Sequence, residues 1–258
     1  MTHNAAYRRI LQKMGYYNYQ QGLIFRHLKQ EGGWNSHLQN CRNFILKAVS
    51  LEKPRKITVL GSGWLLDLPL KEITEYAEEI RLIDIVHPPE VREQAGALEH
   101  VSLAEEDITG GLIQEVWTKA GRRSVFNRLR SLDNVRVPEY HTMDDPGLVL
   151  SLNILTQLET LPLMFIKKKS VIDEESFFRF RQEVQKRHID FLKKHRSVLI
   201  TDTVEIIKDR SGNLTEEPSL IVDLPEAGYR EEWIWHFENT RSDYYTRRSD
   251  FRVVALLI

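Results

Sequence analysis

Short apolar runs alternate with longer amphipathic stretches along most of the chain. Lys56–Leu60 is rich in β-branched residues and is typical of a strand that is buried on both faces. Ile80–Val86 and Gly147–Leu152 follow the same pattern, and His100–Glu105 is a weaker strand candidate. Because helical segments separate these runs, we expect a parallel sheet built from right-handed βαβ units.

Positions spaced three or four apart predict the helices. From Trp34 to Val49 the apolar residues lie on one helical face, and Glu174–Lys194 forms a longer, charged helix with an aromatic face. A helical stretch is expected around 69–79, whereas 109–145 mixes helix and turn signals and is expected to be an irregular insertion.

The last third of the chain predicts an antiparallel end to the sheet. Ser197–Ile207 is a strand candidate, Asp209–Asn213 is a turn, and Glu232–Phe237 and Phe251–Ile258 are two further strands joined by a polar loop. The expected fold is α/β and doubly wound, with a mainly parallel seven-stranded sheet that ends in an antiparallel C-terminal hairpin.

Two parts of the chain are expected. Residues 1–50 are polar and aromatic-rich and predict an N-terminal helical extension, interrupted at Gly32 and Gly33. Residues 51–258 then form one Rossmann-like domain, because 258 residues do not require a second core.

Composition narrows the classes of function. Hydrophobic residues make up 41% and charged residues 28%, as in water-soluble globular proteins, and the net charge of −1 gives no general attraction to polyanions. Cys41 stands alone, so no internal disulfide is expected, and the histidines lack the spacing of metal ligands. No apolar run approaches the ~20 residues that cross a bilayer, and the first residues lack the apolar middle of a secretion signal. We therefore expect a cytoplasmic protein with no membrane partner and no metal.

The sharpest local motif is the glycine turn Gly61-Ser62-Gly63 after the first strand. Glycines let the backbone turn tightly and approach a ligand closely, and the neighbouring amides can donate hydrogen bonds. A plain strand-to-helix turn explains an isolated motif of this kind about equally well.

An acid follows each of the next two strand candidates. Asp84 lies 23 positions after Gly61, where a carboxylate can accept hydrogen bonds from both hydroxyls of a ribose. Asp107 is placed to receive the amine of adenine, with Ile108 packed on the ring. The alternatives are a turn aspartate at Asp84 and a helix cap at Asp107.

A small polar segment follows the strand candidate Gly147–Leu152. It leaves Asn153 where the crevice of a doubly wound sheet opens, so its side chain is a candidate contact for cofactor or substrate. An asparagine that starts a helix is the competing interpretation.

Together these motifs resemble the class I S-adenosylmethionine-dependent methyltransferases over residues 56–258. The resemblance implies that the turn Gly61–Gly63 runs under the methionine part of the cofactor and that Asp84 and Ile85 hold the ribose end. It implies further that Asp107 and Ile108 approach adenine and that Asn153 lies beside the transferred methyl. Such a protein would be an enzyme, a methyltransferase with S-adenosylmethionine as its cofactor.

Several departures keep other functions open. The family often has an acid where Val59 stands and a third glycine where Leu65 falls, which leaves a non-catalytic binding module as an alternative. Asp67 could supply a carboxylate nearby, although a helix N-cap is the plainer interpretation. An NAD(P)-dependent oxidoreductase would need its third glycine at Leu66, which argues against that class.

The sequence narrows the substrate only to broad chemical classes. Near-zero net charge favours a small molecule or a protein side chain over bulk nucleic acid, and RNA stays open as a local partner through the basic, tyrosine-bearing stretch from Arg241 to Arg252. In the helical extension, four residues are candidates for a lid over the substrate, although packing roles are the plainer interpretation: Tyr16, Tyr17, Trp34 and His37.

Overall fold

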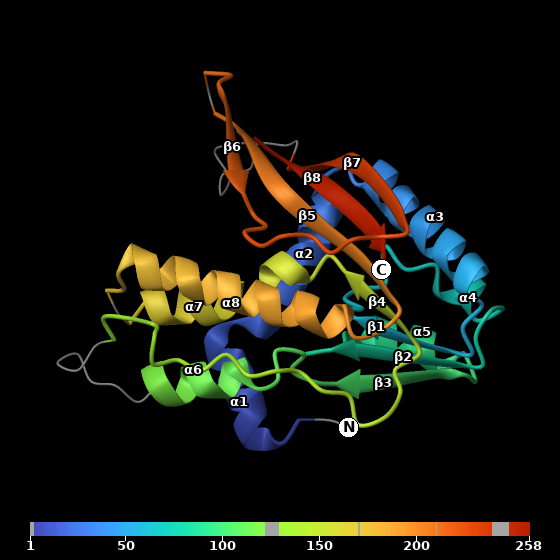
Figure 1. Cartoon of the computed structure of the whole chain (residues 1–258), viewed down its shortest axis with the longest axis horizontal. Coiled ribbons are helices and arrows are strands. Elements are labelled where there is room, and N and C mark those ends of the chain that lie inside the picture. Colours follow the sequence, from blue (N-terminus) through green and yellow to red (C-terminus); the bar gives the residue numbers. More distant parts are fainter. Residues whose placement is uncertain (1–2, 122–128, 170, 210, 239–247) are drawn as a thin grey trace.

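A computed structural model describes residues 3–121, 129–169, 171–209, 211–238 and 248–258. Within these ranges one mixed sheet has the order β3-β2-β1-β4-β5-β8-β7, with an eighth strand, β6, paired to the outer part of β5 (Figure 1). The strands are β1 (Lys56–Leu60), β2 (Glu79–Asp84), β3 (Val101–Glu105), β4 (Leu148–Leu152), β5 (Ser197–Lys208), β6 (Leu214–Pro218), β7 (Tyr229–Glu238) and β8 (Arg248–Leu257). The doubly wound α/β fold predicted from the sequence is confirmed.

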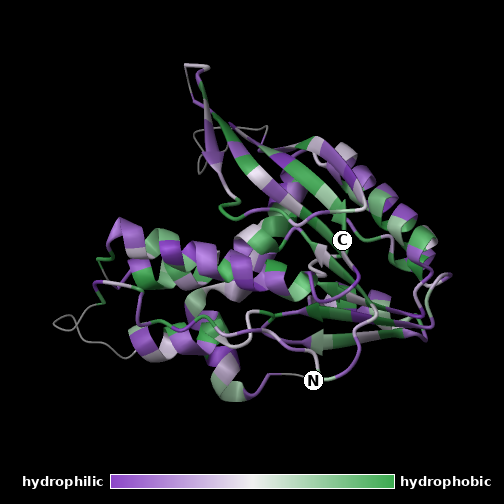
Figure 2. Ribbon diagram, in the orientation of Figure 1, coloured by the Kyte–Doolittle hydropathy of each residue, from purple (hydrophilic) through white to green (hydrophobic). Residues whose placement is uncertain are grey.

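The parallel half of the sheet forms the centre of the molecule. β1 pairs in parallel with β2 on one side and with β4 on the other. Every residue of β4 is buried, as are four of the five in β1, and the central strands are mostly hydrophobic in Figure 2. Because the chain winds outward in opposite directions from β1, the loops after β1 and β4 part and leave room for a ligand at the carboxyl ends of these strands.

The predicted antiparallel end is also present. β8 pairs with β5 along its whole length and with β7 on its other side. The β5–β8 register shifts between Asp202 and Val204, which marks a bulge in β5 at the point where the strand leaves the parallel core. The seven-stranded prediction missed β6, all of whose residues are exposed and therefore carry no alternation of buried and exposed positions.

Two helical layers cover the sheet (Figure 1). One apolar core joins α1, α6, α7 and α8 to one face, and the other joins α3, α4 and α5 to the opposite face. The helices are α1 (Ala5–Met14), α2 (Tyr16–Lys29), α3 (Asn35–Glu52), α4 (Leu70–Ile73), α5 (Pro89–Gly96), α6 (Leu112–Ala120), α7 (Thr160–Lys167) and α8 (Glu174–Leu192), with a 3₁₀ turn η1 (Leu155–Gln157).

Several predicted boundaries were wrong. The helix expected at 69–79 is only the single turn α4, because Glu78 and Glu79 donate backbone hydrogen bonds to the Arg55 carbonyl and draw the chain into β2. β2 ends at Asp84 rather than at Val86. The stretch expected to be irregular contains α6, introduced by the left-handed glycine Gly111.

Two helices were missing from the prediction altogether. α7 is apolar on almost every side and so shows no amphipathic period, and α5 begins at the second residue of a Pro-Pro pair. The long helix α8 and its apolar face are confirmed.

A buried histidine joins α8 to the sheet. The Nε2 of His188 lies 2.8 Å from the Oγ of Ser151 in β4, and both side chains are buried. Burial lowers the pKa of His188 to about 4. The unfolded chain therefore binds this proton more tightly than the folded chain does. The free energy of unfolding receives the full contribution of the neutral imidazole above the ordinary pKa of 6.5, and this contribution falls as the pH drops toward 4.

We expect the free energy of unfolding to fall between pH 7 and pH 5 by about 2 kcal/mol more in the parent than in a His188→Gln variant. Urea unfolding at the two pH values measures both. Taking the difference between the two proteins cancels the titration of every other group. Parallel pH profiles would show that the pKa of His188 is the same in the folded and the unfolded chain.

Candidate functional site

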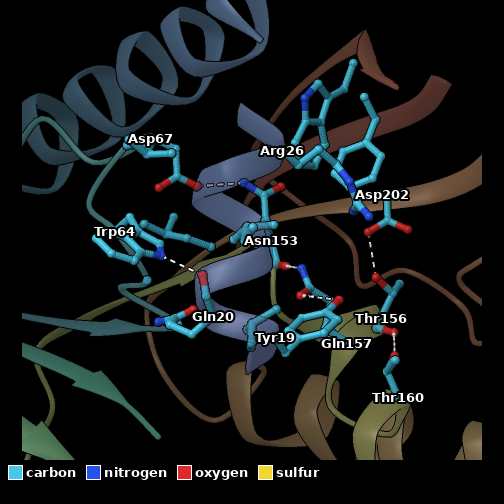
Figure 3. A pocket seen from close by; sticks show the side chains of 18 of the residues that line it. Tyr19, Gln20, Arg26, Trp64, Asp67, Asn153, Thr156, Gln157, Thr160 and Asp202 are labelled. Carbon is cyan, nitrogen blue, oxygen red and sulfur yellow. Dashed lines mark hydrogen bonds between the residues drawn. The ribbon is translucent and has the colours of Figure 1, made fainter. Parts of the chain in front are cut away.

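A cavity of about 450 Å³ opens at the carboxyl ends of the central strands. Its floor is the loops after β1, β2 and β4, one side is the outer part of β5, β7 and β8, and α2 crosses over it (Figure 3). Six of the eight residues predicted to bind a cofactor line it: Gly61, Ser62, Gly63, Asp84, Ile85 and Asn153.

The turn after β1 can be built only with glycine at its first position. Gly61 has φ +76°, and a Cβ there would lie 2.8 Å from the Cβ of Ile154 in the loop after β4. The Gly61 amide donates to the Ile83 carbonyl, so the turn still belongs to the sheet. Ser62 is buried, and its Oγ has no hydrogen-bond partner among the described residues. The turn therefore offers a polar group to whatever occupies the cavity.

Asp84 joins the ends of β1 and β2. Its Oδ2 accepts from the Gly63 amide at 2.8 Å, and its Oδ1 accepts from the Ile85 amide at 2.7 Å. Burial raises the pKa of the carboxyl, and the hydrogen bond from Gly63 opposes this shift. Asp84 thus orders the glycine turn and also lines the cavity.

Asn153 has an unusual backbone and a fixed amide. Its φ is +49°, in the left-handed region, and its own amide N–H continues the sheet by donating to Ile200 in β5. The side-chain Nδ2 donates to Asp67 Oδ2 at 2.7 Å (Figure 3). Since that contact takes the amide nitrogen, Oδ1 points elsewhere, and this buried oxygen has no partner among the described residues.

Asp67 is part of the site rather than a helix cap. The residue at the cap position of α4 is Pro69, which makes no side-chain hydrogen bond, so the N-cap interpretation was wrong. Asp67 lines the cavity and positions Asn153 instead. Burial raises the pKa of its carboxyl, and the hydrogen bond from Asn153 lowers it.

Asp107 and Ile108 do not line this cavity. Asp107 accepts hydrogen bonds from Thr109, Ile113 and the Tyr7 hydroxyl, the last at 3.2 Å, so it fixes the start of α6 and holds α1. Ile108 is buried in the adjoining core. The adenine contacts predicted for both residues stay a prediction, and for Asp107 they would require Tyr7 to give up its hydrogen bond.

α2 is the cover of the cavity, and it is bonded to three loops. The indole N–H of Trp64 donates to the Gln20 carbonyl at 2.8 Å, and the Gln20 side chain donates to Val86 at 3.3 Å. Tyr19 donates to Gln157 at 3.3 Å (Figure 3). The loops after β1, β2 and β4 therefore all hold the same helix.

Of the four lid candidates in the helical extension, three line the cavity. These are Tyr16, Trp34 and His37, whereas Tyr17 packs against the apolar core. His37 Nδ1 accepts from the Trp233 indole at 3.0 Å, and burial lowers its pKa to about 3. His37 is therefore a neutral imidazole in the wall.

Other lining residues were missed because their elements meet only in the folded chain. Asp202 and Glu205 come from β5, Phe237 from β7 and Arg26 from α2. A polar residue inside an apolar strand, such as Asp202, was the one signal that could have found this group.

No group of three or more histidine, cysteine or carboxylate side chains in the described ranges could hold a metal ion. No helix in the same ranges is long and apolar enough to cross a membrane. In the basic stretch proposed for RNA, residues 241–247 lie outside the described residues, and Arg252 pairs with Glu216.

Comparison with known proteins finds likenesses to solved structures only. No protein-family model matches the chain, and no curated protein matches it. The N-methyltransferase NodS from Bradyrhizobium japonicum WM9, solved with S-adenosyl-L-homocysteine, is 12% identical over 85% of each chain, with a TM-score of 0.42. The DhpI–SAH complex is 10% identical over 96% of each chain (TM-score 0.33). The methyltransferase domain of bacterial CtHen1-CN is 11% identical over 84% of this chain and 99% of its own (TM-score 0.32).

The strand order defines the class of fold. Five parallel strands in the order β3-β2-β1-β4-β5, followed by β8 inserted antiparallel between β5 and β7, make the doubly wound sheet with an antiparallel end that the resemblance to the class I methyltransferases implies. The chain has this fold.

Proposed function

We propose that this protein binds S-adenosylmethionine in the cavity and transfers its methyl group. The observation that carries the proposal is Asp84, whose carboxylate is fixed at the end of β2 by the Gly63 amide, in the wall of a cavity at the carboxyl ends of β1, β2 and β4. A buried acid next to a glycine turn is the arrangement that binds the ribose of a nucleotide-type ligand.

The residues present fit this cofactor. The turn Gly61–Gly63 would leave room for the methionine part of the cofactor. Ser62 in this turn offers a hydroxyl that has no partner among the described residues. Asp84 would accept hydrogen bonds from the ribose hydroxyls, and Ile85 would pack beside the base. When bound, the cofactor supplies a methyl group on a sulfonium. Asn153 and the loop after β4 would orient the acceptor, and α2 would exclude water from the reacting atoms.

A ligand that binds only the folded chain raises its melting temperature. We expect S-adenosylmethionine and S-adenosylhomocysteine to raise it by several degrees at millimolar concentration, and NAD and NADP to leave it unchanged. Differential scanning fluorimetry with the four ligands measures this. A shift with NADP alone would favour the oxidoreductase alternative, and no shift with any of the four would favour a binding module.

A further inference from the structure

Beyond Asn153 the cavity ends in an aromatic chamber, formed by the rings of Trp34, Trp235, Phe237 and Phe251. Trp34 stacks on Phe237 with centroids 5.3 Å apart, and Trp235 meets Phe237 edge-on at 4.8 Å. The chamber lies on the β5–β8–β7 side, away from the Gly61–Asp84 end where the proposed cofactor is expected. It is therefore the part of the cavity left for a methyl acceptor.

The walls near the chamber are acidic. Asp202 and Glu205 on β5 line the cavity together with Asp67. His37 adds no positive charge, because its Nδ1 accepts a hydrogen bond and burial lowers its pKa. Among the described lining residues Arg26 is the one cation, and its charge is matched by Glu238, whose Oε2 lies 3.1 Å from the Arg26 Nε.

The aromatic chamber already stabilises one positive charge, that of Arg26. Its guanidinium lies 4.8 Å from the centre of the Phe237 ring, and in Figure 3 its side chain points toward Asp202. A positive charge between an aromatic face and carboxylates is stabilised by both. The same surroundings disfavour an anion.

Two buried polar groups at the chamber have no partner among the described residues. One is the Oδ1 of Asn153, which points away from Asp67 because Asp67 accepts a hydrogen bond from the amide nitrogen of the same side chain. The other is the indole N–H of Trp235, a side chain that is only 7% exposed. A buried group without a partner is costly, so these positions are ones that a bound ligand would satisfy.

The loop that carries Asn153 is fixed to the acidic strand. The Asn153 amide donates to Ile200, and the Thr156 hydroxyl donates to Asp202 Oδ1 at 2.6 Å (Figure 3). These two contacts tie the loop that carries Asn153 to β5, the strand that carries Asp202.

We propose that the methyl acceptor is an amine, bound with its nitrogen between Asn153 Oδ1 and Asp202 and its apolar part in the aromatic chamber. This inference rests on the proposed function. The acceptor arrives as an ammonium ion and loses one proton to solvent. The nitrogen lone pair then forms the new N–C bond as the C–S bond breaks, and the electrons of that bond stay on sulfur. Asn153 Oδ1 accepts a hydrogen bond from a remaining N–H and so directs the lone pair.

The test compares three probes of nearly equal shape and different charge: benzylamine, benzyl alcohol and benzoate. Each is titrated into the full chain near neutral pH, with and without saturating S-adenosylhomocysteine, and tryptophan fluorescence is recorded. We expect benzylamine to bind about tenfold or more tightly than benzyl alcohol, and benzoate more weakly still. Equal affinity for benzylamine and benzyl alcohol, or a preference for benzoate, would overturn the inference.

Three variants test which carboxylates cause the preference for benzylamine. Asp202→Asn and Glu205→Gln are expected to reduce the preference for benzylamine several-fold and to leave S-adenosylhomocysteine binding unchanged, which also shows that both variants fold. Glu99→Gln, an exposed residue just before β3 at the amino end of the sheet, is the matched control and should keep the full preference. A preference that survives in both β5 variants would contradict the assigned site. A preference for benzylamine without any S-adenosylhomocysteine binding would support the amine site and refute the methyltransferase proposal. Binding of S-adenosylhomocysteine without a preference for benzylamine would support the methyltransferase proposal and refute the amine site.

Discussion

Replacing Gly61 with alanine is expected to lower the free energy of unfolding by about 2–4 kcal/mol and to remove detectable S-adenosylhomocysteine binding. Two effects add at this position. The left-handed φ of +76° is strained for alanine, and the new Cβ would lie 2.8 Å from the Cβ of Ile154, which must then move. Because Ile154 follows Asn153, that movement displaces both sides of the cavity. Urea unfolding and calorimetric titration measure the two losses.

Gly63→Ala separates strain from crowding. Gly63 also has a left-handed φ, of +51°, but a Cβ there would meet nothing closer than the Gly61 carbonyl at 3.9 Å. We expect a loss of only about 1 kcal/mol in this variant. Equal losses in the two variants would mean that the contact with Ile154 contributes nothing.

Asp84→Asn is expected to weaken S-adenosylhomocysteine binding by about 1–3 kcal/mol, the usual effect of removing hydrogen bonds to a charged group. The amide keeps the size of the side chain and one oxygen for the Gly63 amide, but its NH2 group then faces the Ile85 amide, so the melting temperature should also fall. Calorimetric titration of parent and variant measures the difference in affinity.

The matched control is Glu79→Gln at the opposite end of the same strand, where the side chain pairs with Lys56 outside the cavity. It should bind as the parent does. Parental affinity in Asp84→Asn would show that Asp84 only orders the turn and does not hold the ligand.

The centre of the fold could be predicted because its signals are local. β1 and β4 are continuous apolar runs that the sheet buries, and Gly61 stands directly after β1 because the turn needs its conformation. Asp84 could be located for the same reason, since it ends the next strand. Where a strand is buried on both faces and a tight turn follows it, the sequence shows both the strand and the residue at which it ends.

The substrate side could not be predicted in this way. Trp34, Asp202 and Phe237 are far apart in the chain and meet only through sheet pairing and the packing of α3 on β7. The bulge after Asp202 has no residue signature in the sequence, although it sets which side chains of β5 face the cavity. Asp107 illustrates the opposite problem, because a local pattern that fits a ligand site also fits the start of α6, where its hydrogen bonds lie.

The central claim is that the cavity binds S-adenosylmethionine. Calorimetric titration of the full chain with S-adenosylhomocysteine, and separately with NAD and NADP, tests it most directly. We predict one site per chain for S-adenosylhomocysteine, no heat of binding from either nicotinamide cofactor, and a weakened site in Asp84→Asn. Absence of S-adenosylhomocysteine binding to the folded parent, or binding of NADP in its place, would contradict the claim.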